Sequence, residues 1–167
     1  MYYYLLILAV ALERLAELVV SKRNATWSFA QGAKEFGQRH YLVMVALHTA
    51  LLVGCLVEPW ALHRPFIGWL GWPMAVVVAL CQGLRWWCIN SLGKRWNTRV
   101  IVLPHAQLVK RGPYRFMHHP NYVAVVVEGV ALPLVHTAWI TALVFTVANA
   151  ALLTVRLRVE NSVLGYS

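Results

Sequence analysis

The segment Leu108–Tyr122 (LVKRGPYRFMHHPNY) contains several residue types that can build a ligand-binding turn. Gly112 and Pro113 together fix a turn and allow a ligand to approach the backbone closely. Pro120 suits the first turn of a helix, where its missing N–H group is not needed. The free N–H groups at such a helix start can hold an anionic group. The spacing therefore predicts a turn followed by a helix start, with a ligand beside them.

Side chains of the same segment add proton-transfer and stacking chemistry. His118 and His119 titrate near neutral pH, and Tyr114 and Tyr122 offer planar faces on which a base can stack. The two adjacent histidines have no further acid or histidine at metal-ligand spacing, so we predict no metal site. These residues are candidates to bind a cofactor, and His119 is also a candidate base.

Arg85 is a charged residue in an apolar stretch, a costly position in a membrane and hence a candidate for function. It follows a long apolar run and precedes two tryptophans. Its guanidinium can hold a carboxylate or an oxyanion through paired hydrogen bonds. Alternatively, it can extend to the headgroups of the inner membrane surface. The position alone leaves both roles open.

Three more charges lie close together in the first apolar stretch. Glu13 and Glu17 share one helical face through their i, i+4 spacing, and Arg14 lies beside them. Residues three or four apart on a helix can pair. We therefore expect a structural ion pair here, such as Arg14 with Glu17.

Charged residues near the C-terminus have both a structural and a functional interpretation. Glu128 lies in an apolar stretch, where a carboxylate must pair or be protonated. It either bonds to a neighbouring helix or faces the reacting group. Arg156 and Glu160 are four residues apart in the tail. They either form a surface ion pair or line the same cytoplasmic mouth as His119.

The elements that must position these residues are predicted to be membrane-spanning helices. Of the 167 residues, 60% are hydrophobic and 13% are charged, whereas a soluble domain carries about 25% charged residues. A spanning helix needs about 20 largely apolar residues. Five candidate spans follow, of which the short fourth and the fifth would form a tight hairpin: Tyr2–Val20, Tyr41–Val57, Phe66–Ile89, Tyr122–Val135 and Trp139–Val155.

Lys and Arg are concentrated in alternate connecting segments of this five-span arrangement. Twelve of the 15 fall on one side, Arg14 and Arg85 lie within spans, and only Arg64 falls on the other side. Basic loops stay in the cytoplasm, so the N-terminus is predicted outside and the loop Ser91–His119 inside. These loops account for the net charge of +9, which therefore does not indicate nucleic-acid binding. Within the loop, Val100–Leu103 is expected to be a short extended piece.

The pattern G-P-Y-x-x-x-x-H-P-x-Y, then an apolar hairpin and R-x-x-x-E, resembles the isoprenylcysteine carboxyl methyltransferase (ICMT) family. The match covers roughly Leu84–Leu164, and the segment Leu84–Trp96 (LRWWCINSLGKRW) is similar to the family's stretch before its cytoplasmic loop. Span number and orientation agree with short prokaryotic members. The resemblance implies a single all-α polytopic domain (1–167) in a bacterial inner membrane. Residues 1–65 would form the N-terminal spans and residues 66–167 the catalytic part.

The resemblance also implies S-adenosylmethionine as methyl donor, entering from the cytosol, and a lipophilic acceptor entering from the bilayer. Arg85 would position the acceptor oxygen, and Glu160 would lie near the amino-acid portion of the cofactor. A phenol acceptor would need a base, for which His119 and Glu128 are candidates. The cofactor pocket, formed with the C-terminal hairpin, would comprise Leu108, Val109, Gly112, Tyr114, His119, Pro120, Tyr122, Arg156 and Glu160.

Two positions depart from the family pattern. The usual Arg-His-Pro is His118-His119-Pro120 here, so one cationic contact becomes titratable. The usual Glu-Glu of the tail is Glu160-Asn161, which alters the end of the cofactor pocket. The chain also lacks the extra spans of eukaryotic members, which argues against a prenylated protein as substrate.

The chain is most similar to a short bacterial branch of the family, through Ser91–Pro104 (SLGKRWNTRVIVLP) and Gly37–Tyr41 (GQRHY). That branch is associated with O-methylation of alkylpyrone or alkylresorcinol polyketides. Such an acceptor carries an acidic enol or phenol on an alkyl tail. The alternative within the family is carboxyl methylation of a small prenylated thiol.

Two other classes of function remain open from the sequence. One is a sterol-reductase-like enzyme that uses NADPH through the same hairpin and loop. The short cytoplasmic segment argues against it, since little protein is left to hold a second nucleotide. The other is a non-catalytic membrane protein or transporter, and the absence of repeated halves argues against a transporter.

Overall fold

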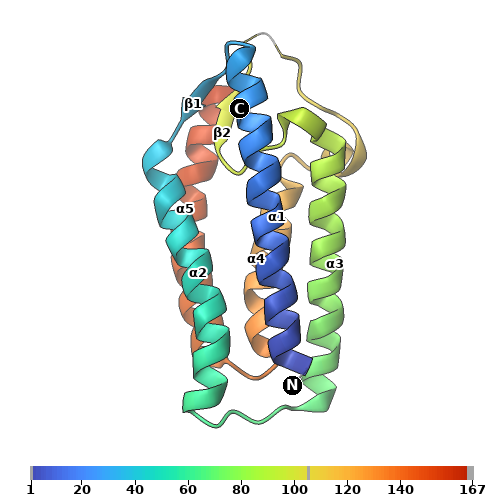
Figure 1. The fold of residues 1–167 in the computed structure, drawn as a ribbon, viewed down its shortest axis with the longest axis vertical. Helices are drawn as coiled ribbons and strands as arrows, with labels where there is room; N and C mark the ends of the chain where they lie inside the picture. The colour runs from blue at the N-terminus through green and yellow to red at the C-terminus, as the bar shows by residue number, and fades with distance from the viewer. Residues whose placement is uncertain (1, 105, 165–167) are drawn as a thin grey trace.

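The computed structural model describes residues 2–104 and 106–164, which form a helical bundle (Figure 1). The short elements are β1 (Lys34–Phe36), β2 (Val100–Val102) and the 3-10 turns η1 (Gly93–Arg95) and η2 (Gly112–Arg115). The α-helices are α1 (Tyr2–Ala30), α2 (Gln38–Ala61), α3 (Gly68–Leu92), α4 (Pro120–Leu134) and α5 (Trp139–Leu164).

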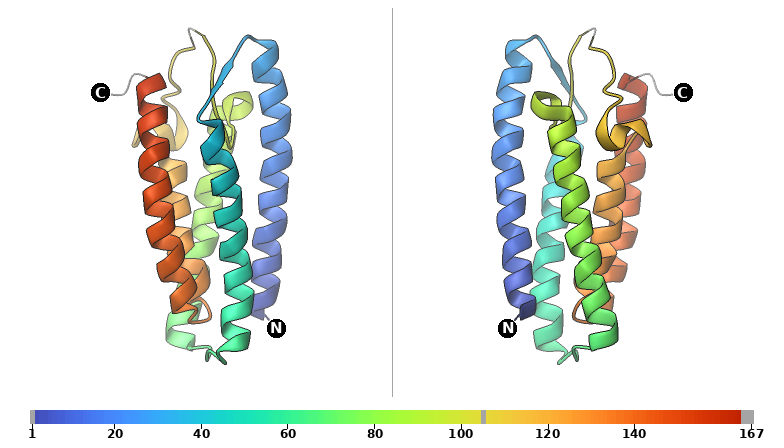
Figure 2. Two further views of the ribbon diagram at one scale, coloured as in Figure 1. Left: turned by 90° about the vertical axis from the view of Figure 1, so that its left-hand side faces the viewer. Right: turned by 90° about the vertical axis from the view of Figure 1, so that its right-hand side faces the viewer.

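The helices run side by side along the long axis of the molecule, and the chain reverses direction from each helix to the next (Figures 1 and 2). The α1–α2 connection, the segment 93–119 and the end of α5 therefore lie at one end of the bundle. The α2–α3 and α4–α5 connections lie at the other. α4 packs against α3 and α5, and α5 packs against α2, while α1 contacts α2, η1 and β2.

Each apolar stretch predicted as a span is a helix, but two helices continue well past the predicted ends. α1 runs on from Val20 to Ala30, and α5 runs on from Val155 to Leu164. Counting apolar residues finds only the part of a helix that suits a lipid core. A helix does not have to end where its sequence becomes polar, since an already formed helix extends at little cost.

A two-stranded antiparallel ribbon is the departure from the predicted all-α chain within the described residues. Lys34, Glu35 and Phe36 pair with Val102, Ile101 and Val100, respectively. The extended conformation predicted for Val100–Leu103 is thus confirmed over its first three residues. Its partner strand was not predicted. The ribbon connects the turn between α1 and α2 to the loop that follows α3.

The chain is an integral membrane protein by the length and composition of its helices. Two of the helices fall short of an ordinary spanning segment, since α1 carries three charges in its apolar stretch and α4 has only 15 residues. Many large apolar side chains face outward, including Trp69, Leu80, Leu143 and Val147, as lipid-facing surfaces require. Three helices are long and apolar enough to cross a membrane, over His40–Ala61, Gly68–Arg95 and Trp139–Val163.

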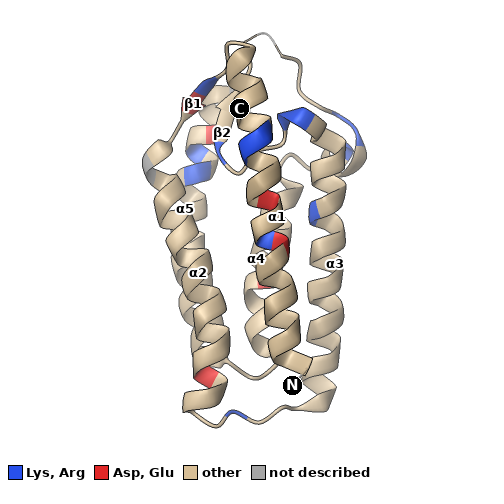
Figure 3. Cartoon of the chain, in the orientation of Figure 1, with Lys and Arg blue, Asp and Glu red and all other residues tan. Residues whose placement is uncertain are grey.

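Basic side chains gather at the end of the bundle that holds the segment 93–119 (Figure 3). At the opposite end, Arg64 pairs with Glu58, which also accepts hydrogen bonds from the backbone N–H groups of Ile140 and Thr141. The fold thus brings the basic connecting segments together as the five-helix arrangement predicted. A group of further charges lies midway along α1, α3 and α4.

An apolar core holds the five described helices together near the end of the bundle that lies away from the segment 93–119. Its members come from every helix, and they include the buried thiol of Cys55. Lipid tails are as apolar as these side chains, so close packing between the helices, not removal from water, stabilises this core. The fully or nearly buried members are Tyr3, Ile7, Val10, Leu51, Cys55, Val78, Ala131, Leu132, Val135 and Phe145.

Gly129 allows α4 and α5 to approach closely. A Cβ atom at this position would lie 2.1 Å from the Phe145 ring. We expect Gly129→Ala to lower the stability of the bundle by about 1–3 kcal/mol, the usual cost of overpacking. Thermal unfolding in detergent measures this. Gly83→Ala in α3 is the matched control, because nothing lies within 4 Å of a Cβ there, and equal effects of the two changes would contradict the prediction.

Candidate active site

The loop between α3 and α4 is held over the basic end of the bundle by side chains of α1 and α5. Asn24 donates to the carbonyls of Gly93 and Trp96 at 3.1 and 2.8 Å. Ser21 accepts a hydrogen bond from the Thr98 backbone N–H at 3.0 Å. From the other side, Arg156 Nη2 donates to the Thr98 carbonyl at 2.6 Å. Residues 93–98 are therefore fixed between helices from both halves of the chain.

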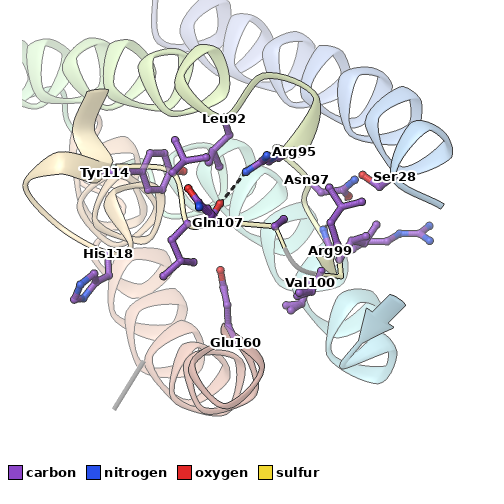
Figure 4. A pocket seen from close by; sticks show the side chains of 16 residues that line it. Ser28, Leu92, Arg95, Asn97, Arg99, Val100, Gln107, Tyr114, His118 and Glu160 are labelled. Carbon is purple, nitrogen blue, oxygen red and sulfur yellow. Dashed lines mark hydrogen bonds between the residues drawn. The ribbon is translucent and has the colours of Figure 1, made fainter. Parts of the chain in front are cut away.

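A cavity of about 170 Å³ lies under this loop, and polar side chains and apolar ones share its wall (Figure 4). Glu160 of α5 points into it from one side, and Tyr114 of η2 forms another wall. Arg95 donates to the Gln107 carbonyl at 2.8 Å, which ties the two ends of the loop together across the cavity. Of the residues predicted to bind a cofactor, Leu108, Val109, Tyr114 and Glu160 line this cavity.

A second polar cavity of about 80 Å³ adjoins the first and shares Tyr114, His118 and Glu160 with it. The predicted residues His119, Tyr122 and Arg156 line this second cavity. Seven of the nine predicted cofactor-binding residues therefore border one or both of the adjoining polar cavities.

A chain of hydrogen bonds connects α4 and α5 at the second cavity. Arg156 Nε donates to the Tyr122 hydroxyl at 2.7 Å, and that hydroxyl donates to Glu160. The His119 ring stacks on the Tyr122 ring with centroids 5.3 Å apart. Its Nε2 pairs with Asn161 Oδ1 at 2.8 Å. Asn161, which stands where the family pattern has a second Glu, thus forms a hydrogen bond with His119.

The other two predicted residues, Gly112 and Pro120, shape the walls instead of lining a cavity. Gly112 has a φ of +57°, and a Cβ there would lie 2.0 Å from Ser91 Oγ. Pro120 is buried at the first turn of α4, the position predicted for it. Burial also raises the pKa of the Tyr114 phenol, so its hydroxyl stays protonated in the wall.

A third cavity is larger, mostly apolar, and extends from the basic end into the bundle. Its volume is about 280 Å³. Leucines and valines of α1, α2, α4 and α5 supply much of its apolar wall, and polar side chains lie among them. The polar and charged residues on its wall are Arg14, Glu17, His48, Thr49, Arg85, Thr98, Asn121, Tyr122, Asn149 and Arg156.

The apolar cavity and the second polar cavity share a wall made of Trp96, Asn121, Tyr122 and Arg156. Asn121 Oδ1 is buried there without a hydrogen-bond partner among the described residues. A polar compartment at the basic end and an apolar compartment inside the bundle therefore meet at one place. A reaction between a polar and a lipophilic molecule needs such a meeting point.

Four charged residues form a cluster beside the apolar cavity. Arg85 donates from Nε to Glu17 Oε1 at 2.7 Å, and its Nη2 bonds the other oxygen of Glu17. Arg14 Nη1 donates to Glu17 at 3.1 Å, which confirms the expected pair, and Arg14 Nη2 bonds Glu128. Gln82 also donates to Glu128, at 3.0 Å. The cluster links α1, α3 and α4.

The structure does not bring the three predicted catalytic residues together. Arg85 borders the apolar cavity, and His119 borders the second polar cavity. Glu128 borders neither of them and is paired with neighbouring helices, the structural alternative for this residue. Arg85 is also less available than predicted, because Glu17 takes up its Nε and Nη2 groups. Its Nη1 is buried without a hydrogen-bond partner in the described part of the chain.

Several polar residues of the cavity walls escaped the sequence reasoning, among them His48, Asn121 and Asn149. Polar groups inside spans mark functional sites in membrane proteins whether or not they are charged. His48 and Asn149 fall inside predicted spans, so the same criterion applied to uncharged groups would have found them. Among residues 2–104 and 106–164, no group of three His, Cys, Asp or Glu side chains is placed to hold a metal ion.

The fold and the paired cavities define a helical membrane protein that can bring a polar and a lipophilic molecule together. Comparison with known proteins adds the chemistry. The family model for the isoprenylcysteine carboxyl methyltransferase (ICMT) family matches residues 74–165. The chain belongs to this family of membrane methyltransferases, as its motifs indicated.

Two similar proteins come from other bacteria. A Bacillus subtilis protein described as uncharacterized protein YpbQ is 38% identical over 163 residues, which cover 97% of this chain and 96% of the relative. An uncharacterized protein of Haemophilus influenzae is 24% identical over 154 residues, covering 92% of this chain and 89% of that protein. Both similarities extend over α1 and α2, which the family model does not match.

Proposed function

We propose that the protein is an S-adenosylmethionine-dependent O-methyltransferase that acts on a lipophilic acceptor at the membrane surface. The observation that carries this proposal is the wall shared by the polar and apolar cavities, at Trp96, Asn121, Tyr122 and Arg156. A water-soluble donor and a lipid-soluble acceptor would each occupy the compartment that suits its polarity. Their reacting atoms would meet at this wall, where the protein aligns them and excludes water.

The residues of the polar cavities fit the cofactor. Glu160 supplies a carboxylate for an ammonium group, and Tyr114 supplies an aromatic face for a base. Leu108 and Val109 line the same cavity, where their backbone groups could form further hydrogen bonds with the cofactor. The cofactor would supply an activated methyl group. Arg156 and Tyr122 would hold the wall against which that group lies, through their bonds to Thr98 and Glu160.

The charged cluster favours a hydroxyl acceptor over a carboxylate. An arginine clamps a carboxylate best with two parallel N–H groups. Glu17 already occupies the Nε and Nη2 groups of Arg85, and its negative charge would repel a second carboxylate. Arg85 keeps Nη1 for one oxygen of the acceptor. An enol or phenol on an alkyl tail fits this arrangement better than the carboxyl group of a prenylated thiol.

The proposed topology has five crossings with the basic end in the cytoplasm. Basic segments flanking membrane spans stay on the cytoplasmic side, and the basic side chains of this chain gather at one end (Figure 3). The N-terminus would then lie outside, and the polar cavities would open to the cytosol, where the cofactor is found. Residues 1–167 would act as one domain, since α1 and α2 supply walls of the apolar cavity.

A titration of the purified protein with S-adenosylhomocysteine and with NADPH tests the proposal. We expect the first to bind and the second not to bind. Glu160→Gln should weaken S-adenosylhomocysteine binding about tenfold, because a partly exposed charged hydrogen bond is lost. Ser162→Ala, two residues further along α5 and exposed, is the control. Binding of NADPH alone would favour a reductase, and binding of neither would favour a non-catalytic protein.

A further inference from the structure

His48 is a histidine of α2 on the wall of the apolar cavity. Its Nδ1 lies 2.8 Å from the Met44 carbonyl oxygen, one turn earlier in the same helix. A carbonyl oxygen only accepts hydrogen bonds, so Nδ1 must carry the hydrogen. In the neutral ring, Nε2 is then the nitrogen with the lone pair. The helix itself therefore fixes which ring nitrogen can take up a proton.

The surroundings of His48 leave that nitrogen available. No hydrogen bond to Nε2 is formed within the described residues. The ring meets Phe145 edge-on, with centroids 5.4 Å apart. Met44, to which His48 is bonded, rests against the Arg156 guanidinium of the shared wall. His48 and Met44 therefore both line the apolar cavity, one helical turn apart on α2, and Met44 connects His48 to Arg156 of the shared wall.

A hydroxyl acceptor needs a base, because methylating a neutral O–H group releases a proton. The two bases suggested by the sequence are not placed for this task. Glu128 is held by Arg14 and Gln82 and does not border the apolar cavity. His119 lies on the polar side and is paired with Asn161. Among the described residues, His48 is the histidine that lines the apolar cavity.

We propose that His48 is the general base of the methyl transfer, acting on an acceptor hydroxyl bound in the apolar cavity. This inference rests on the proposed function. The hydroxyl proton passes to Nε2 while the oxygen forms a bond to the methyl carbon. The carbon–sulfur bond breaks and its electron pair stays on sulfur, which becomes a neutral thioether. The charged groups that act on the imidazolium are Arg14, Glu128 and Arg156, and the ring returns its proton to water after product release.

Two acceptors of different acidity separate a base from a structural residue. The probes, compared at about pH 9, are para-dodecylphenol, which is still mostly neutral there, and its ortho-nitro derivative, which is mostly ionised. We expect His48→Gln and His48→Asn to lower turnover of the phenol by about a hundredfold or more. Turnover of the nitrophenol should change little, because its proton is already gone. His63→Gln, in the exposed turn between α2 and α3, is the control and should leave both rates unchanged.

An equal loss on both acceptors would overturn the proposal and leave His48 as a packing residue. His48→Asn guards against misfolding, because its amide can still donate to the Met44 carbonyl. Failure of the wild-type protein to bind S-adenosylhomocysteine would instead contradict the proposed function, so the two failures are distinguishable.

A measurement without cofactor gives a second readout. The nitrophenolate ion absorbs at longer wavelength and more strongly than the neutral nitrophenol, so the absorption spectrum reports whether bound probe has lost its proton. We expect wild-type protein to bind the probe as the nitrophenolate ion at a pH where free probe is partly neutral. The His48 variants should shift that transition to higher pH, while His63→Gln should not. The same transition in all proteins would contradict proton transfer to His48.

Discussion

Arg85→Ala should both destabilise the protein, by about 3–5 kcal/mol, and abolish turnover. The stability loss arises because Arg85 provides both hydrogen bonds to one edge of the buried Glu17 carboxylate. Removing one partner of a buried ion pair strongly destabilises a protein, and among the described residues Glu17 would keep only the single arginine hydrogen bond from Arg14 at 3.1 Å. The turnover loss arises because Arg85 Nη1 is the group left to orient the acceptor oxygen. Thermal unfolding in detergent measures the first effect, and methyl transfer to para-dodecylphenol measures the second.

Two variants separate these effects. In Arg85→Gln combined with Glu17→Gln, no charge is stranded, so we expect stability to recover while turnover does not. Arg64→Ala is the control. Arg64 lies in the α2–α3 connection, where it is partly exposed and paired with Glu58. We expect this change to lower stability by less than about 1 kcal/mol. Full turnover in the double variant would show that Arg85 does not orient the acceptor oxygen.

Arg156→Ala should lower S-adenosylhomocysteine affinity by about 10–100-fold. The buried Arg156 guanidinium bonds the Thr98 carbonyl and the Tyr122 hydroxyl, and it belongs to the wall between the cavities. Hydrogen bonds to charged groups contribute about 1.5–3 kcal/mol, and each 1.4 kcal/mol is tenfold in affinity. Without this side chain, the loop over the cofactor loses its bond to α5, and Tyr122 no longer has a donor.

Arg158→Ala is the matched control, since Arg158 lies two residues further along the same helix and is exposed. We expect isothermal titration to give the same affinity for this variant as for the wild type. If both changes weakened binding equally, loss of positive charge at the basic end would explain the result. Arg156 would then have no specific part in the wall.

The sequence predicted the helices well because a lipid core imposes a minimum length of apolar chain. Seven of the nine residues proposed from the sequence to bind a cofactor line the polar cavities, because they lie in one short motif and one helical turn of α5. Ends such as Ala30 were missed because a helix can leave the membrane without ending. The pairing of Lys34–Phe36 with Val100–Val102 was missed because such short strands have no periodic pattern of their own.

Contacts between helices could not be read from the sequence. Arg85 was identified as a candidate clamp, but the carboxylate that occupies it comes from Glu17, 68 positions earlier. Local spacing paired Glu17 with Arg14 and carries no information on a partner so distant. In the same way, the place of His48 beside the shared wall depends on how α2 packs on α5. An apolar side chain that faces lipid and one that lines an internal cavity have the same residue types, so the sequence does not distinguish them.

The short length of α4 has a consequence for the surrounding lipid. Its 15 residues extend about 22 Å at 1.5 Å per residue, whereas the hydrocarbon layer is about 30 Å thick. α4 meets α5 at the far end of the bundle, so the shortfall falls at the basic end. In the proposed topology with five crossings, the bilayer there would thin, or water would enter a depression, to match the protein. The polar compartment would then lie below the level of the headgroups, and an acceptor could present its oxygen while its tail stays among the acyl chains.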